Sequence, residues 1–106
     1  MPPKIQKILK KLKKELIRIY GEQLDSIILY GSQARGDARE DSDIDVLIVL
    51  KKDFNYSEML RLSSDLAAAL SLENDVVISR AFVSKEEFEH RQIPFLMNVR
   101  REGMSV

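Results

Sequence analysis

The chain has 106 residues, which is room for one domain spanning residues 1–106. Its content of 44% hydrophobic, 7% aromatic and 32% charged residues is ordinary for a globular protein and excludes disordered or low-complexity classes. With no cysteine and one histidine, the chain cannot form a disulfide framework, a thiolate nucleophile, a zinc ribbon or a multi-histidine metal site. Its chemistry must come from carboxylates, hydroxyls, cations and backbone groups.

Charge is balanced overall, with 17 basic and 17 acidic residues, but it is distributed unevenly along the chain. Residues 1–20 carry seven Lys or Arg against one Glu, and residues 21–75 carry five against twelve. An acidic centre repels phosphates, so a central site that handled them would need metal ions. Apolar runs such as Val46 to Leu50 are far shorter than the roughly 20 residues that cross a bilayer. We therefore expect a soluble cytoplasmic protein without a membrane partner.

The first predicted element is an amphipathic helix from about Pro3 to Tyr20, ended by Gly21. Its apolar stripe consists of Ile5, Ile8, Leu9, Leu12, Leu16 and Ile19. Lysines fill the opposite face, which would suit an RNA-binding ridge or a solvated surface. Because no aromatic residues are interleaved with the lysines, we favour the solvated surface and expect no nucleic-acid partner.

Three strands and three further helices are predicted after this helix. Strands are expected over residues 26–30, 43–50 and 75–83, each rich in apolar β-formers. Asn55 and Glu58 resemble a capping box that opens a helix to about Ser71. Ser84 marks another helix start, and Pro94 to Glu102 forms the last helix. The order α-β-β-α-β-α-α predicts an α/β (α+β) domain with a small, mostly central sheet.

A glycine-serine turn follows the first predicted strand. Gly31 and Gly36 are spaced as in a P-loop, but Asp37 and Ala38 stand where that motif needs Lys and Ser or Thr, so the chain is not a Walker-type NTPase. The free N–H groups of a turn or short helix after Gly31 can hold phosphate oxygens, and Gly31 lets phosphates approach the backbone. Ser32 could bond a phosphate or cap the turn.

Two carboxylates at the start of the second strand are the best candidates for metal ligands. Asp43 and Asp45 are two residues apart, so on a strand their side chains leave the same face with Cα atoms roughly 6.6 Å apart. Such a pair can ligate one or two Mg²⁺ ions, and two ions about 3.5–4 Å apart suit phosphoryl displacement. Ile44 and Val46 would face the core and anchor the pair.

The combined pattern Gly31-Ser32, ten residues, then Asp43-x-Asp45 resembles the signature of the DNA polymerase β-like nucleotidyltransferases. The wider string from Tyr30 to Gly36, with Ser42 before Asp43, is similar to the minimal nucleotidyltransferase branch. This resemblance implies a small mixed sheet flanked by helices, two Mg²⁺ ions, and transfer of a nucleoside monophosphate from an NTP to an acceptor hydroxyl. Many such proteins are antitoxins of an all-helical HEPN ribonuclease toxin, and some adenylylate it.

The resemblance also implies a third carboxylate on a neighbouring strand. Asp75 matches that position and would open the third strand, with Glu73 as the alternative; Asp53 and Asp65 are excluded by reach. Arg35 could contact phosphates, or it could form an ion pair with Asp37 or Glu40. Arg39 and Arg80 are weaker candidates of the same kind.

The predicted function is transfer of AMP from ATP to a hydroxyl of a protein partner, by an antitoxin of the HEPN/MNT type. The alternative is a non-catalytic antitoxin that masks its toxin by binding. Because one small domain leaves little chain for an acceptor pocket, we expect another chain, a HEPN-like toxin, to complete it. A homo-oligomer is a separate expectation. The apolar residues expected at the interface with the toxin are Phe95, Leu96, Met97, Val99 and Met104, and core packing is the alternative explanation for some of them.

Overall fold

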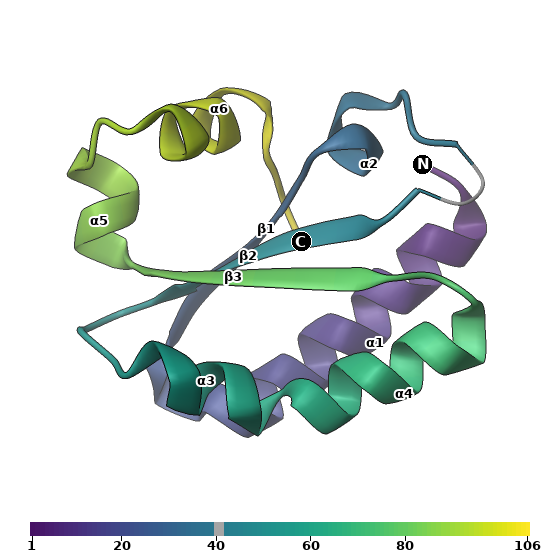
Figure 1. Ribbon diagram of the computed structural model, residues 1–106, viewed down its shortest axis with the longest axis horizontal. Coiled ribbons are helices and arrows are strands. Elements are labelled where there is room, and N and C mark those ends of the chain that lie inside the picture. Colours follow the sequence, from purple (N-terminus) through teal and green to yellow (C-terminus); the bar gives the residue numbers. More distant parts are fainter. Residues whose placement is uncertain (40–41) are drawn as a thin grey trace.

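The computed structural model describes residues 1–39 and 42–106 and contains a mixed four-stranded sheet (Figure 1). Its strands are β1 (Leu24–Tyr30), β2 (Ile44–Leu50), β3 (Ile78–Ser84) and β4 (Met104–Ser105). They lie in the order β3-β2-β1-β4, with β2 antiparallel to β1 and parallel to β3. The predicted α/β class with a small mixed sheet is confirmed.

Helices cover both faces of this sheet (Figure 1). On one face lie α1 (Pro3–Tyr20), α3 (Tyr56–Leu62) and α4 (Ser64–Asn74), with the 3₁₀ turn η1 (Gly21–Gln23) linking α1 to β1. On the other face lie α2 (Ser32–Arg35), α5 (Lys85–His90) and α6 (Pro94–Glu102). No helix in the described part of the chain is long and apolar enough to span a membrane.

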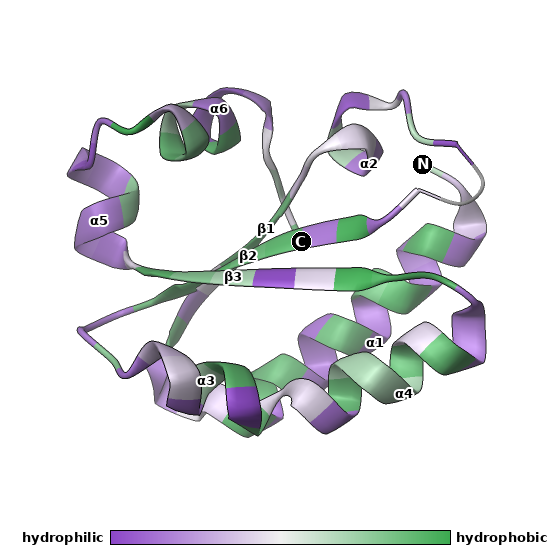
Figure 2. Ribbon diagram, in the orientation of Figure 1, coloured by the Kyte–Doolittle hydropathy of each residue, from purple (hydrophilic) through white to green (hydrophobic). Residues whose placement is uncertain are grey.

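The central strand β2 is apolar on both faces except at its start, as the hydropathy colouring shows (Figure 2). Ile44, Val46 and Ile48 are completely buried in the core beneath α1, α3 and α4. Leu47 and Val49 point the other way and pack with residues of α6. The predicted anchoring role of Ile44 and Val46 is therefore confirmed, because both lie in the main core.

The single helix predicted from Asn55 to Ser71 is wrong in one respect, because it is broken at Ser63 into α3 and α4. The Tyr20 hydroxyl donates to the Met59 carbonyl (2.6 Å), and Arg80 donates to the Leu60 carbonyl (3.0 Å). These two side chains donate hydrogen bonds to backbone carbonyls at the end of α3, where the helix break removes the usual N–H donors. Ser63 is fully buried and bonds both Tyr20 and Arg80.

The third strand begins later than predicted. It starts at Ile78, and Asp75 instead closes α4 in the left-handed conformation (φ 52°), which aspartate tolerates better than most residues. The helix extends to Asn74, whose side chain donates to the Leu70 carbonyl (2.9 Å). Smaller differences are that the first strand starts at Leu24 and that β2 starts one residue after Asp43. The turn or short helix predicted after Gly31 is present as the helix α2.

Candidate functional site

Gly31 joins β1 to α2 and lies against the carboxylate of Asp45. Its dihedral angles, φ 75° and ψ −156°, belong to a region that is essentially restricted to glycine. A Cβ added at this position would lie 2.5 Å from Asp45 Oδ2. Gly31 is therefore required twice, for the backbone turn and for the space that the carboxylate occupies.

Ser42, just before β2, contacts α2 and the segment that directly follows α2. The buried Gln33 amide nitrogen lies 3.5 Å from the Ser42 carbonyl oxygen, and the Ser42 hydroxyl accepts a hydrogen bond from the Arg39 N–H (2.8 Å). These contacts bring the chain back to the sheet next to the end of β1. The N-cap of α2 is Gly31 and Ser32 is the first residue of the helix, so Ser32 does not occupy the capping position predicted for it, and its phosphate contact stays a prediction.

The sheet register places Asp45 between Tyr30 of β1 and Ser79 of β3. The three side chains form a row across three strands, on the face that α6 also covers. Asp43 is exposed and directly precedes β2, on the same side of the strand as Asp45. The structure thus brings together Gly31, Asp43 and Asp45.

Burial and like charge act together on Asp45. Its pKa is raised, first by burial and then by the negative charge of Asp43, while the positive charge of Arg35 acts in the opposite direction. A half-buried carboxylate beside a second one is electrostatically strained until a cation neutralises the pair. Two carboxylates on one face supply the hard oxygen ligands that Mg²⁺ prefers, so the pair fits a magnesium site.

Arg35 lies near Asp45 but is held by two other carboxylates. Its Nε is 3.2 Å from Asp37 Oδ2, and its Nη1 is 3.6 Å from Glu102 Oε2 at the end of α6. Hydrogen bonding to Asp37 is the main cause that raises the pKa of Arg35. The ion pair predicted with Asp37 is confirmed, and Glu40, the other predicted partner, lies outside the described residues. Arg80 points to the opposite face of the sheet, so it is not a phosphate ligand here.

Asp75 is not brought into the carboxylate pair. Among the described residues, no three Asp, Glu or His side chains lie close enough to hold one metal ion together. The Ile44 N–H donates to the Val77 carbonyl (2.9 Å), so Val77 flanks the start of β2, and Asp75 lies two residues before it. Glu73, the alternative to Asp75, forms an ion pair with Lys11 of α1, in which Glu73 Oε2 lies 3.5 Å from Lys11 Nζ.

Sequence reasoning gave Ser79 no role, and it placed Tyr30 only in the family string and Phe95 only at the expected partner interface. Ser79 and Tyr30 flank Asp45, and Phe95 of α6 packs edge-on against Tyr30, with ring centroids 5.3 Å apart and planes at 84°. Tyr30 directly precedes the glycine-serine turn, which is a local signal. Ser79 and Phe95 join the site only through strand register and helix packing, which no local pattern reveals.

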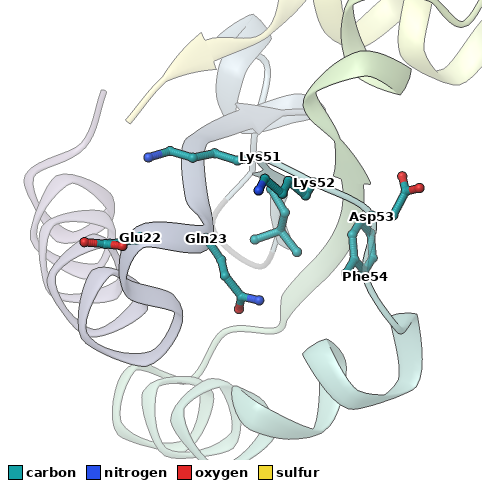
Figure 3. Close-up of a pocket in the computed structure, with 7 residues that line it drawn as sticks. Glu22, Gln23, Lys51, Lys52, Asp53 and Phe54 are labelled. Carbon is teal, nitrogen blue, oxygen red and sulfur yellow. The ribbon is translucent and has the colours of Figure 1, made fainter.

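A hollow of about 540 Å³ lies elsewhere (Figure 3). It is lined by Glu22, Gln23, Leu50, Lys51, Lys52, Asp53 and Phe54. Leu50 ends β2, whereas Asp45 is near its start, so this hollow is at the opposite end of the strand. The carboxylate pair is not among its lining residues.

Solved structures with a similar fold include proteins described as nucleotidyltransferases. A "putative nucleotidyltransferase from Sulfolobus solfataricus" has a TM-score of 0.68 at 21% identity, covering 96% of this chain and 80% of its own. A structure described as "the toxin-antitoxin with AMP-PNP" has a TM-score of 0.59 at 23% identity, covering 92% and 70%. These matches define the class of fold.

The sequence places the chain within this class. Residues 4–94 match the family model "Polymerase beta, Nucleotidyltransferase", and the chain belongs to that family. It is 41% identical over 100 residues to "Putative protein adenylyltransferase MJ0604" of Methanocaldococcus jannaschii, covering 92% of this chain and 93% of that protein. It is 35% identical over 80 residues to "Protein adenylyltransferase MntA" of Thermococcus cleftensis, covering 76% and 79%. The predicted family is confirmed.

Proposed function

We propose that this nucleotidyltransferase moves AMP from ATP to a hydroxyl group of a protein partner, with Mg²⁺ as the metal. The observation that carries the proposal is the contact between Asp45 and Gly31, which sets a carboxylate pair beside the start of α2. Phosphate groups held at α2 would therefore lie next to metal ions held by the carboxylates. Relatives named as protein adenylyltransferases support AMP and a protein as the transferred group and acceptor.

Asp43 and Asp45 would hold the magnesium. When bound, a pair of such ions offsets the negative charge that develops on the attacking and leaving oxygens during displacement at phosphorus. Asp75 is the proposed third carboxylate, because it precedes the segment that flanks the start of β2, whereas Glu73 is paired with Lys11. To contribute a metal ligand, Asp75 would have to turn from the end of α4 towards Asp43 and Asp45.

Gly31, Ser32 and Arg35 are the proposed contacts to the triphosphate. In the first turn of α2 the N–H groups of Ala34 and Arg35 donate to the Gly31 carbonyl, so the N–H groups of Ser32 and Gln33 are the candidate donors to phosphate, together with the Ser32 hydroxyl. Arg35 would exchange its two carboxylate partners for phosphate oxygens, which bind a guanidinium strongly. Its pair with the exposed Asp37 is weak because water screens it, so the loss of that pair costs little.

The proposed reaction is an in-line displacement. The hydroxyl oxygen of the acceptor forms a bond to the α-phosphorus of ATP, and the bond from that phosphorus to the oxygen bridging the β-phosphate breaks. Pyrophosphate leaves, and the hydroxyl proton passes to a carboxylate, for which Asp75 is the candidate. Positioning of acceptor and ATP supplies much of the rate.

A HEPN-like helical toxin is the proposed partner, and the chain would act as its antitoxin in the cytoplasm. One neighbour of the same fold is described as the toxin–antitoxin MntA-HpeT, which supports a toxin as acceptor. The interface predicted from the C-terminal apolar residues needs correction, because Leu96 and Val99 are buried in the core beneath α6. Phe95, Met97 and Met104 stay exposed, but Met104 lines a hollow with α1.

Mass spectrometry of the partner tests this proposal and separates it from masking by binding alone. The chain would be co-expressed with its gene neighbour and supplied with Mg²⁺ and ATP, and the same would be done with the Asp43→Asn, Asp45→Asn double variant. We expect the partner to gain the mass of AMP only with the wild-type chain. A stable complex that stays unmodified at saturating Mg·ATP would instead establish the masking antitoxin.

A further inference from the structure

Phe95 is an exposed aromatic residue on a helix that is otherwise firmly seated. Its neighbour Leu96 is 1% exposed and Val99 is 3% exposed, both in the core above β1 and β2, whereas 39% of Phe95 is accessible to solvent. Arg100 holds the other side of α6 by donating to the carbonyls of Phe88 and Arg91. The position of the Phe95 ring is therefore set by α6, although the ring contributes little to the core.

The ring lies where the apolar cover of the sheet ends and the carboxylate row begins. Along β1, Ile28 pairs with Leu47 under α6, and Tyr30, two residues further, pairs with Asp45. Phe95 packs on Tyr30, the β1 residue of the row that contains Asp45. Figure 1 shows α6 and α2 on the same side of the sheet, over its opposite ends.

Two further observations tie α6 to the site. Burial and the neighbouring Asp45 charge both raise the pKa of Tyr30, so its ring lies within the field of that carboxylate. Glu102, at the other end of α6, is 3.6 Å from Arg35 of α2. The helix that carries Phe95 is thus linked to both elements that border the carboxylate pair.

We propose that Phe95, backed by Tyr30, is the stacking surface for the nucleobase of the bound nucleotide. This inference rests on the proposed function, because the nucleotide extends from phosphates at α2 and the carboxylate pair towards α6. A flat purine ring buries the exposed face of an aromatic side chain that water now covers, and Tyr30 keeps that side chain in place. Stacking has no hydrogen-bond requirement, so Phe95 would supply affinity for the nucleoside rather than a strict choice of base.

Calorimetric binding of two ligands separates stacking from phosphate binding. Mg·ATP and Mg·tripolyphosphate share the phosphate chain, and only ATP carries a base. For Phe95→Leu we expect roughly tenfold weaker binding of Mg·ATP and unchanged binding of Mg·tripolyphosphate. Phe95→Tyr keeps the aromatic face and should restore ATP binding. Met97→Leu, a change at another exposed apolar residue of α6, should leave both ligands unaffected.

The outcomes distinguish this inference from the function on which it rests. Wild-type ATP affinity in Phe95→Leu, or an equal loss for ATP and tripolyphosphate, would overturn the stacking role while leaving nucleotidyl transfer intact. Loss of the partner complex in Phe95→Leu with unchanged ATP binding would also overturn it and would assign Phe95 to the partner interface. Absence of Mg·ATP binding by the wild-type chain would overturn both.

Discussion

The two faces of β2 have different compositions and, in the function that we propose, different tasks. On one face Ile44, Val46 and Ile48 are completely buried under α1, α3 and α4. The other face starts with Asp43 and Asp45 and becomes apolar only where α6 covers it. Because side chains alternate along a strand, a buried residue directly anchors each carboxylate without approaching the chemistry. Stability and reactivity can therefore be changed separately within one short segment.

The largest expected effect is on the reactive face. Replacing either aspartate of the pair by asparagine (Asp43→Asn or Asp45→Asn) removes a charged metal ligand and should reduce transfer from ATP labelled at the α-phosphate by at least about 100-fold. Thermal melting should show an unchanged or slightly stabilised fold, because the repulsion that raises the pKa of Asp45 is relieved. Undiminished transfer by either variant would refute the metal-binding role of the pair.

The next largest effect is expected for Asp75→Asn. Because this variant loses the proposed general base, transfer should fall by about 10²–10⁴-fold, while ATP binding should be retained. Glu73→Gln is the matched control, since Glu73 lies in the last turn of α4, which Asp75 closes, and forms an ion pair with exposed Lys11. Single-turnover rates and ATP binding would be measured for both. Equal rates for wild type and Asp75→Asn, or a loss confined to Glu73→Gln, would show that Asp75 is the wrong carboxylate.

On the buried face, Ile48→Ala should act only on stability. Ile48 has no exposed surface, so truncation leaves a cavity and should lower the free energy of unfolding by about 2–5 kcal/mol. Urea denaturation measures this loss. Transfer per folded molecule should match the wild type at a temperature where both are folded, and a large drop in that rate would contradict the separation of the two faces.

Gly31→Ala should affect both stability and transfer. The unfavourable dihedral angles should lower the free energy of unfolding by about 1–3 kcal/mol, which is less than the loss expected for Ile48→Ala. Its added Cβ would meet the Asp45 carboxylate, so transfer should fall as well. Gly36→Ala is a useful control, because Gly36 also has a positive φ (81°) but an added Cβ there meets no atom within 4 Å. Equal transfer by the two variants would mean that the contact with Asp45 is unimportant.

The helices whose start and end are marked by local sequence patterns were predicted most accurately. The bounds of α1 and α6 agree with the prediction, because each helix has a proline near its start. The N-terminal caps at Asn55 and Ser84 form as expected, because each is a local pattern of neighbouring residues. The break at Ser63 was missed because it depends on Tyr20 and Arg80, which are distant in sequence.

In the candidate site, too, features set by local sequence were predicted, whereas features set by contacts between distant segments were not. Gly31, Asp43 and Asp45 were predicted from their spacing, and the structure brings them together. The contact of Gly31 with Asp45 and the register of Ser79 arise only when the strands pair. Asp75 was expected on a strand, but the helical signal of the preceding residues extends α4 to Asn74 and leaves Asp75 as its left-handed end.

The metal dependence of ATP binding tests the central claim most directly, because the claim is that Asp43 and Asp45 hold Mg²⁺ for the nucleotide. ATP would be titrated calorimetrically into the wild-type chain and into the Asp43→Asn, Asp45→Asn double variant, with and without Mg²⁺. We predict that Mg²⁺ strengthens ATP binding to the wild type and has no such effect on the double variant. Equal strengthening by Mg²⁺ in both proteins would contradict the account.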